Sequence, residues 1–375
     1  MKNYKKIIII IPLESKNREL FSKLFLSYKI LENINCTIII GSQRDIFQNI
    51  LKIKNVIWID KNNYFKKINN NPLLKNNYKI LLDEEGPHSL HDFHEEKLRI
   101  SKKLLNFFDF IITWGKNDLN QFKKKHYFGH PKFDLLKKNS NKIFEEDKKK
   151  IKKKYKKYVL INSSFEFDEI QKNLIHNIRR IHLKNYKKDK EKLKILDQKR
   201  YDLYTKQISL VNKLALQNKE INFIYRPHPF QDIKKVKKKF NKLKNLKVIF
   251  QGPVTPWIKG CEMLIHSGCS TYLEAFSLEK KIINYFPVKI SNWKKFCFSG
   301  NTYFDEATFL ENFKNIKNNR KNDTFNKSIF DIVENLKPKK YFYKDFCKFI
   351  KKEFNNLKSE IIYGKKVKEK ILFKV

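Results

Sequence analysis

The sequence predicts an α/β protein with two Rossmann-like, doubly wound domains that face a central cleft, followed by a helical C-terminal tail. Short, continuous apolar runs alternate with helical patterns along the chain. Strands that are apolar at every position are typical of parallel sheets covered on both faces. The alternation stops at the charged segment 145–157 and then starts again. With 375 residues, the chain is long enough for two domains with full cores.

The N-terminal domain, 1–150, holds the first series of apolar runs. Strands are expected at 7–12, 36–41, 56–60, 78–86, 108–115 and 126–129, and helices at 19–31 and 94–107. Residues 1–13 resemble a signal peptide, but their apolar run is short and meets Glu14, Lys16 and Arg18 without a cleavage site. We therefore interpret residues 7–12 as the first core strand.

The C-terminal domain, 151–300, repeats the pattern. Strands are expected at 158–165, 221–229, 246–252, 262–268 and 281–287, with a Lys-rich helical insertion at about 166–210. Segment 145–157 is either a charged linker or a solvated helix. Residues 301–375 are helical in pattern and heavily charged. We expect them to form a tail that packs back on the domains.

The charge of the chain bears on its partners. The formal net charge is +43, which by itself would indicate nucleic acid or an anionic membrane. Only eight of the 82 basic residues are Arg, the residue that binds phosphate and guanine through two hydrogen bonds. We therefore expect no nucleic-acid partner, and peripheral contact with an anionic membrane stays open.

Cysteine and histidine spacing indicates neither a metal site nor disulfides. The five cysteines (36, 261, 269, 297 and 347) form no C-x-x-C pair, which predicts buried thiols in a reducing cytoplasm. His88, His91 and His94 lie close in sequence but lack a matching carboxylate pattern, so no metal and no cofactor are expected. No stretch approaches the roughly 20 apolar residues of a membrane span. We expect a cytoplasmic protein, at most peripheral to the inner membrane.

Three carboxylates, Asp83, Glu84 and Glu85, follow the apolar run that begins at residue 78. Adjacent carboxylates repel one another, which raises at least one pKa toward the range of a general base. The same residues can also be solvated loop charges, one of them capping a helix. Gly86 and His88 continue the segment in a tight turn.

Two further segments have the residues of a phosphate site. In Arg226-Pro227-His228-Pro229, the prolines stiffen an imidazole donor at a strand end, although a purely structural turn is the alternative. The loop from His266 to Thr271 contains Gly268 for a tight turn and opens a helix, whose N-terminus favours phosphate. Thr271 and Glu274 have capping-box spacing, although Glu274 could bond a ribose instead. The expected nucleotide site comprises Arg226, His228, Pro229, His266, Ser267, Gly268, Ser270, Thr271 and Glu274.

These segments resemble, in the same order, a family of bacterial surface carbohydrate biosynthesis proteins encoded among lipopolysaccharide and capsule genes. The likeness runs to about residue 287, and segment 129–134 has His130 and Lys132 where Asn and Arg are expected. The matching motifs are P-x-E-x-K-x-R-E at 12–19, L-D-E-E-G at 82–86, I-T-W-G at 112–115, G-x-P-x-x-D at 129–134, L-I-N-S-S-F at 160–165, R-P-H-P at 226–229, V-T-P-W-I at 254–258 and I-H-S-G-C-S-T-Y-L-E-A at 265–275. The likeness assigns Glu14, Lys16, Arg18, Gly86, His88 and Asn162 to the acceptor site or the cleft.

That family is similar in turn to GT-B glycosyltransferases, including bacterial sialyltransferases and Kdo transferases. Those enzymes share a D/E-D/E-G motif with a catalytic carboxylate and an HP motif that binds the phosphate of a CMP-sugar. The resemblance places the motifs at Glu84-Glu85-Gly86, or at Asp83-Glu84 shifted by one, and at His228-Pro229. Glu84 is favoured as the base because it holds the first place of the motif. A serine-containing third motif matches Ser267, Ser270 or Thr271.

The resemblance implies a metal-independent glycosyltransferase that moves a sugar from a nucleotide-activated donor, with a CMP-linked donor as one candidate, to a lipopolysaccharide O-antigen or capsule acceptor. The N-terminal domain would bind the glycan or lipid-linked glycan acceptor, and the C-terminal domain the donor. Two alternatives stay open. One is a nucleotide-sugar epimerase or polyol-phosphate transferase of the same fold, and the other is a non-enzymatic basic protein that binds a membrane surface or nucleic acid.

Overall fold

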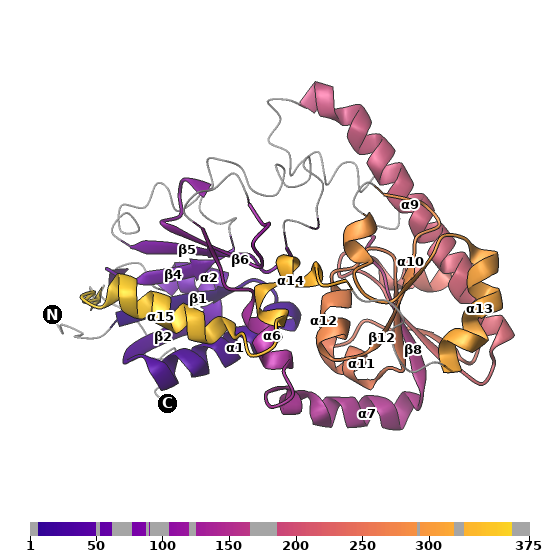
Figure 1. The fold of residues 1–375 in the computed structure, drawn as a ribbon, viewed down its shortest axis with the longest axis horizontal. Helices are drawn as coiled ribbons and strands as arrows, with labels where there is room; N and C mark the ends of the chain where they lie inside the picture. The colour runs from indigo at the N-terminus through magenta and orange to yellow at the C-terminus, as the bar shows by residue number, and fades with distance from the viewer. Residues whose placement is uncertain are drawn as a thin grey trace. The chain divides into compact units, whose positions relative to one another are not determined.

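The computed structural model describes residues 7–49, 53–61, 77–87, 90, 105–119, 125–165, 186–290, 293–318 and 326–361. The chain forms two compact units (Figure 1). The first takes residues 1–89, 100–135 and 330–375, and the second takes 90–99 and 136–329. The division therefore falls at 135 rather than at the expected 150. The expected tail, 301–375, is not one piece but is divided between the units at residue 330.

The first unit is built on a six-stranded sheet in the order β2-β1-β4-β5-β6-β7, and every pairing in it is parallel. The predicted strands are confirmed, although β5 ends at residue 82 rather than 86. The strands are β1 (Ile7–Leu13), β2 (Cys36–Ser42), β4 (Ile57–Asp60), β5 (Tyr78–Leu82), β6 (Phe110–Thr113) and β7 (Lys125–Tyr127).

Strand β1 shows why this sheet is apolar throughout. Ile9 and Ile11 point into one core cluster, while Ile8 and Ile10 point into another on the opposite face. All four side chains are fully buried. Helices α1 (Lys16–Asn33) and α15 (Phe342–Phe354) contribute to the cluster of Ile9. Helix α2 (Gln43–Asn49) contributes Ile46 to the other.

The segment after residue 330 is anchored to the first unit by one buried carboxylate. Asp134 accepts hydrogen bonds from the Asn335 amide (2.7 Å) and from the backbone N–H groups of Phe342 (3.0 Å) and Tyr343 (2.9 Å). It therefore satisfies two free N–H groups at the start of α15, as a capping residue does. Asp134 lies in α6 (Pro131–Leu136), and Asn335 lies in the 3-10 helix η5 (Glu334–Leu336).

Two glycines allow the same segment to approach closely. A Cβ at Gly115 would collide with the backbone carbonyls of Asp331 and Ile332, where α14 (Ile329–Ile332) ends. Gly129 has φ +92°, and a Cβ there would collide with Asn335. The glycines of the I-T-W-G and G-x-P motifs are thus explained by packing.

After α15, β14 (Glu360–Ile361) pairs antiparallel with β3 (Ile53–Lys54), a ribbon that the sequence pattern did not predict.

The second unit contains another six-stranded parallel sheet, in the order β10-β9-β8-β11-β12-β13. The predicted strands are again confirmed, but the edge strand β13 was missed because it is short and only half-buried. The strands are β8 (Tyr158–Asn162), β9 (Asn222–Arg226), β10 (Leu246–Val248), β11 (Met263–His266), β12 (Lys281–Tyr285) and β13 (Asn301–Tyr303).

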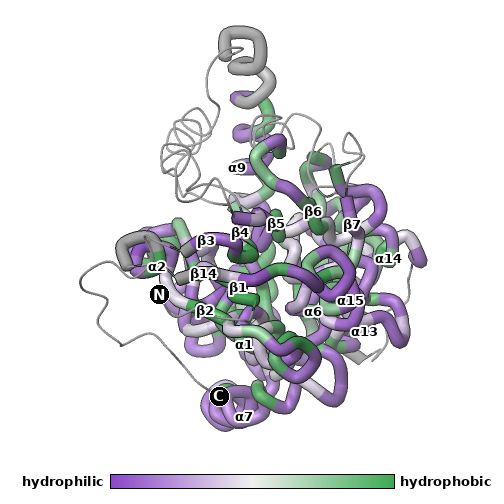
Figure 2. Tube along the Cα trace, turned by 90° about the vertical axis from the view of Figure 1, so that its left-hand side faces the viewer, coloured by the Kyte–Doolittle hydropathy of each residue, from purple (hydrophilic) through white to green (hydrophobic). Residues whose placement is uncertain are grey.

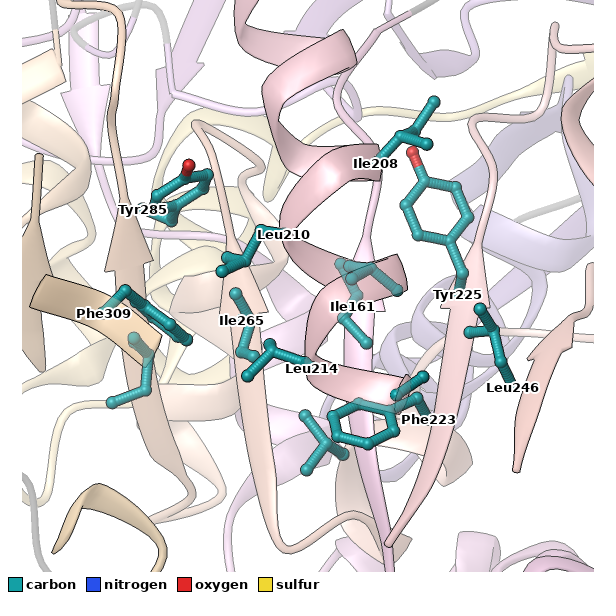
Figure 3. Close-up of a cluster of buried hydrophobic side chains, with 14 of the residues drawn as sticks. Ile161, Ile208, Leu210, Leu214, Phe223, Tyr225, Leu246, Ile265, Tyr285 and Phe309 are labelled. Atoms are coloured by element: carbon teal, nitrogen blue, oxygen red, sulfur yellow. The ribbon is translucent and has the colours of Figure 1, made fainter. Parts of the chain in front are cut away.

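Helices cover this sheet on both faces. Helix α9 (Tyr186–Gln217) packs its C-terminal half on the sheet, and Figure 3 shows Leu210 and Leu214 beside Ile161 and Ile265. The charged segment after residue 144 is helix α7 (Glu145–Tyr155), hydrophilic over most of its length (Figure 2). Acidic residues in its first turn and basic residues in its last complement the helix dipole. The other helices are η3 (Asn141–Phe144), α10 (Ile233–Lys238), α11 (Thr255–Gly260), α12 (Thr271–Ser277), η4 (Trp293–Phe296) and α13 (Glu306–Asn318). Among the described helices, none is long and apolar enough to cross a membrane.

Replacing Asp134 should destabilise the protein strongly. Asp134→Ala leaves two backbone N–H groups without their acceptor in a buried site and removes one of the two hydrogen bonds that the Asn335 amide donates. We therefore expect a loss of about 3 kcal/mol or more in the free energy of unfolding. The matched control is Asp345→Ala, which removes a carboxylate from the first turn of α15. It should change the free energy of unfolding by less than about 0.5 kcal/mol. Urea unfolding measures both, and equal losses would contradict the anchoring role of Asp134.

Candidate functional site

The strand orders fix where each unit can bind a ligand. In the first sheet, β2 lies on one side of β1 and β4 lies on the other. In the second, β9 and β10 lie on one side of β8, and β11 lies on the other. Open α/β sheets bind ligands beyond the carboxyl ends of their strands, at the point where the strand order changes direction. The residues that follow β1 and β4, and those that follow β8 and β11, are therefore the candidate site residues of each unit.

In the first unit, Lys61 connects the ends of three strands. Its Nζ forms an ion pair with the carboxylate of Glu14, after β1, and lies 3.5 Å from a carboxylate oxygen of Glu85, after β5. A third carboxylate, Glu19 in α1, has an oxygen 3.5 Å away. The Lys61 side chain is only 5% exposed, while those of Glu14 and Glu85 are 47% and 37% exposed. Two accessible carboxylates are thus held by one buried ammonium group.

A fully buried layer of charge lies behind them. Lys23 Nζ lies 3.0 Å from Glu19 Oε2 and 3.6 Å from Glu84 Oε1, and it donates to the Pro12 carbonyl at 2.7 Å. Burial alone would lower the pKa of Lys23, but Glu84 and Glu19 raise it above its usual value. Burial, followed by repulsion from Glu84, raises the pKa of Glu19. Lys23 is therefore a permanent cation shared by two carboxylates.

Glu84 also contacts His130. The Glu84 Oε2 and His130 Nε2 atoms are 3.0 Å apart, and both side chains are completely buried. The His130 ring stacks on Trp114 with centroids 4.4 Å apart, and Trp114 Nε1 donates to the Asp83 carbonyl at 2.7 Å. Burial would raise the pKa of Glu84, but His130 and Lys23 together lower it to about 2. Glu84 is therefore a buried carboxylate with little affinity for a proton.

The predicted residues of the first unit thus separate into two groups. Glu85 and Glu14 are accessible, whereas Glu84 and Asp83 are buried, and Asp83 accepts a hydrogen bond from the Glu85 backbone N–H (3.0 Å). Arg18 lies 3.3 Å from Glu14. The remaining predicted positions are less informative: Lys16 is exposed at the start of α1, Gly86 has φ 124°, and His88 lies outside the described residues.

Four members of this cluster were not among the predicted site residues. Lys61 follows a predicted strand directly, so its position at a strand end was a usable signal. Glu19 and Lys23 have the i, i+4 spacing of an ion pair on one helix face. His130 was noticed only as a departure from the family pattern, and its pairing with Glu84 connects residues too distant in sequence for any local pattern to show.

In the second unit, hydrogen bonds link the ends of β8 and β11. Asn162 Nδ2 donates to the Thr271 hydroxyl at 2.9 Å, and the Ser164 hydroxyl donates to the Ser267 carbonyl at 3.0 Å. Gln207, from α9, donates to the Ser267 hydroxyl at 3.0 Å. Asn162 Oδ1 is buried and accepts no hydrogen bond within the described chain.

His266 supports the turn after β11 from the buried side. Its ring is fully buried and stacks on Tyr272 with centroids 5.3 Å apart, and its Nδ1 accepts the Gly268 backbone N–H at 3.3 Å. Gly268 has φ +93°, a conformation that favours glycine. Burial lowers the pKa of His266 to about 4, so the imidazole is neutral near pH 7. His266 holds the loop rather than presenting a charge to a ligand.

The predicted capping box at the start of α12 is wrong. The N-cap residue is Ser270, whose side chain makes no capping hydrogen bond. Glu274 accepts a hydrogen bond from the Thr255 hydroxyl at 2.8 Å instead. The Thr271 hydroxyl donates to the Cys269 thiol at 3.0 Å. The competing partner, Thr255, belongs to α11, so tertiary packing decides this contact against local spacing.

The Arg-Pro-His-Pro segment divides into a structural and an accessible part. Arg226 donates to the carbonyls of Gln251 and Gly252, both at 3.0 Å, and its guanidinium carbon lies 5.3 Å from the ring centroid of Trp257. Burial lowers the pKa of Arg226 to about 10, which leaves it charged at neutral pH. Its described contacts hold the 251–252 loop. His228 is half-buried, and the next residue, Pro229, is exposed.

The turn itself orients the His228 ring. The His228 backbone N–H donates to Gln231 Oε1 at 2.9 Å, and the Phe230 backbone N–H donates to His228 Nδ1 at 3.3 Å. Because Nδ1 accepts, the proton of the neutral imidazole is assigned to Nε2. His228 can therefore donate from Nε2 at the carboxyl edge of the second sheet, as the expected phosphate role requires.

Comparison with known proteins identifies the fold. No family model and no curated protein matches the sequence. Among solved structures, the chain is similar to the wall teichoic acid polymerase TagF, with TM-score 0.55 and 10% identity over 94% of this chain and 89% of that chain. The UDP-GlcNAc 2-epimerase of Methanocaldococcus jannaschii, in complex with UDP-GlcNAc and UDP, has a TM-score of 0.54 and 13% identity, over 92% of this chain and 99% of that chain. S. aureus MnaA with UDP has a TM-score of 0.53 and 10% identity, over 94% of this chain and 97% of that chain.

The predicted fold class is confirmed. The chain has two parallel six-stranded Rossmann-like sheets and the GT-B-like fold of these neighbours. The similar structures are enzymes, a polymerase and an epimerase. Membership of the surface carbohydrate biosynthesis family stays a prediction.

The buried His266 predicts a pH dependence of stability. Its folded pKa of about 4 lies below the usual value of about 6.5, so between these values the unfolded state binds more protons. Stability should fall as the pH drops from about 6.5 to 4, by up to about 3 kcal/mol. His266→Phe keeps an aromatic ring against Tyr272 and should flatten this part of the curve. Urea unfolding across this range measures it, and a variant curve parallel to the parent's would contradict the assignment.

Proposed function

We propose that the protein is a transferase that takes a sugar from a nucleotide-activated donor, with the nucleotide bound at the carboxyl edge of the second sheet. The observation that carries this proposal is the set of oriented polar groups at that edge. His228 offers Nε2–H, and Thr271 lies at the start of a helix. Solved neighbours of the same fold hold UDP-GlcNAc, UDP or CDPG, which supports a nucleotide as the ligand.

The proposed roles follow from the contacts. His228 donates to a phosphate oxygen of the donor, which stabilises the negative charge that develops on the leaving nucleotide. Asn162 acts indirectly, because its amide donates a hydrogen bond to the Thr271 hydroxyl. Arg226 acts indirectly, because its guanidinium fixes the 251–252 loop beside the site. A CMP-linked donor and a lipopolysaccharide or capsule acceptor are the finer form of this proposal.

The proposed base is Glu85 of the first unit. A base that takes a proton from an acceptor hydroxyl must be accessible and must bind a proton in the course of the reaction. Glu84 is completely buried, and its pKa is lowered to about 2, so it meets neither requirement. Glu85 is 37% exposed and is held by Lys61. The geometry thus favours the second carboxylate of the motif over the first, which the sequence favoured.

A nucleotide-sugar 2-epimerase is a second candidate. It is favoured by one observation: the M. jannaschii UDP-GlcNAc 2-epimerase is covered over 99% of its length at a similar TM-score. The two activities differ in their need for an acceptor. An epimerase converts the nucleotide sugar alone, whereas a transferase needs a second substrate. Incubation with UDP-GlcNAc alone, followed by analysis of the sugar, distinguishes them.

Loss of the His228 donor should weaken nucleotide binding. Hydrogen bonds to charged groups are worth about 1.5–3 kcal/mol, so His228→Ala should lower the affinity for the tightest-binding nucleotide by about ten- to a hundredfold. A calorimetric titration with CMP, CDP and UDP measures this. Asp232→Ala is the control, because it removes the cap of α10 next to the turn without removing a donor. Equal affinity in the parent and His228→Ala would move the nucleotide site elsewhere.

The two glutamates should respond differently to removal of charge. Glu85→Gln should lower transfer by about 10²–10⁴-fold while nucleotide affinity stays the same, as expected for a general base. Glu84→Gln should instead lower stability by about 3 kcal/mol, since it leaves Lys23 and His130 buried with less counter-charge. Rates are followed as release of free nucleotide, and stability by urea unfolding. Full activity in Glu85→Gln would show that another group is the base.

A further inference from the structure

Helix α1 exposes a stripe of large, mostly apolar side chains on the side away from the core. Leu24, Tyr28 and Leu31 are 44%, 54% and 39% exposed. Their spacing of four and three residues places them on one side of the helix. The opposite side contributes Leu26 and Ile30 to the core of the first unit. Single exposed apolar residues are ordinary, but a contiguous stripe indicates an interaction surface.

Helix α15 presents a row of lysines next to this stripe. Lys344, Lys348, Lys351 and Lys352 are all exposed, and their spacing places them on one side of the helix. The other side of α15 packs in the same core cluster as α1. Lys29 joins the two helices, because its Nζ lies 5.0 Å from the ring centroid of Tyr28 and 5.6 Å from that of Tyr343.

The acidic residues nearby do not cancel this charge. Glu32 pairs with Lys29 at 2.7 Å, and Glu353 lies 3.8 Å from Lys352. Asp345 is half-buried in the first turn of α15. The surface formed by the apolar stripe of α1 and the lysine row of α15, here called the α1–α15 face, is therefore apolar along one helix and cationic along the next.

We propose that the α1–α15 face docks on an anionic lipid surface. Stable peripheral binding takes two signals, and an apolar insertion next to a basic patch supplies both. The composition argues against a protein partner, because lysine is depleted in protein interfaces. It also argues against a second copy, since a two-fold dimer through this face would bring like-charged lysine rows together. The anionic head groups of a bilayer attract the lysines, and its acyl-chain boundary accepts the apolar side chains.

Vesicle flotation tests this proposal with matched variants. Phosphatidylcholine vesicles with and without phosphatidylglycerol are used, and folding of each variant is checked by thermal unfolding. The stripe variant is Leu24→Ser, Tyr28→Ser, Leu31→Ser, and the row variant is Lys344→Gln, Lys348→Gln, Lys351→Gln, Lys352→Gln. The controls lie in the second unit and are equally exposed: Ile195→Ser, Leu216→Ser on α9, and Lys149→Gln, Lys150→Gln, Lys153→Gln, Lys154→Gln on α7.

The parent should bind only vesicles that contain the anionic lipid, and less at high salt, because exposed charges are screened beyond about 8 Å at physiological ionic strength. The row variant should lose about six-hundredfold in partition coefficient, from about fivefold for each of its four lysines. The stripe variant should lose about tenfold or more.

Three results would overturn the proposal. Controls that lose as much as the row and stripe variants would show that only total charge and total apolar surface matter. Equal binding to neutral vesicles, or no binding at all, would exclude an anionic lipid surface. A parent dimer that dissociates in the stripe variant would identify a second copy as the occupant.

Discussion

Parallel strand pairing is the constraint on which both units depend. It buries each strand on two faces, so the strands themselves must be apolar, and it brings every carboxyl end to the same edge. Pairing of β1 with β4 places Glu14 near Lys61, and pairing of β8 with β11 places Asn162 beside the turn at Gly268. Polar chemistry is thus confined to the residues that follow the strands.

Burying charged side chains at that edge costs free energy, and in the first unit close pairing of opposite charges offsets that cost. Lys23, Glu19 and Glu84 lie almost entirely out of solvent, and His130 closes the set. Such a cluster seldom adds stability relative to well-packed apolar residues. What it does is fix positions: Glu19 contacts both Lys23 and Lys61, and Lys61 in turn holds the two accessible carboxylates, Glu14 and Glu85. The buried layer thereby orients the accessible one.

The sequence predicted the strands and their carboxyl-end loops well, because a fully apolar run needs no distant partner to be recognised. It could not show the contacts that a side chain makes with another element. Arg226 has the residue type of a phosphate ligand, yet it bonds to the carbonyls of Gln251 and Gly252. Glu274 has capping-box spacing, yet it bonds to Thr255. The tail was predicted as one piece because Asp134, which anchors α15, lies far from it in sequence. The spacing of residues in the sequence indicates which contacts are possible, and tertiary packing determines which of them form.

Helix α1 connects the two functional proposals made for the first unit. Its first turn lies at the carboxylate edge, where Arg18 and Glu19 contact Glu14 and Lys23. Its later turns carry the apolar stripe. At about 1.5 Å rise per residue, Leu24 and Leu31 lie about 8 and 18 Å along the helix from Glu19. A lipid surface against the α1–α15 face would therefore lie within the reach of a glycan head group from the carboxylate edge. An acceptor carried on that lipid would meet Glu85 without leaving the membrane, which gives the exposed stripe a reason to lie on this helix.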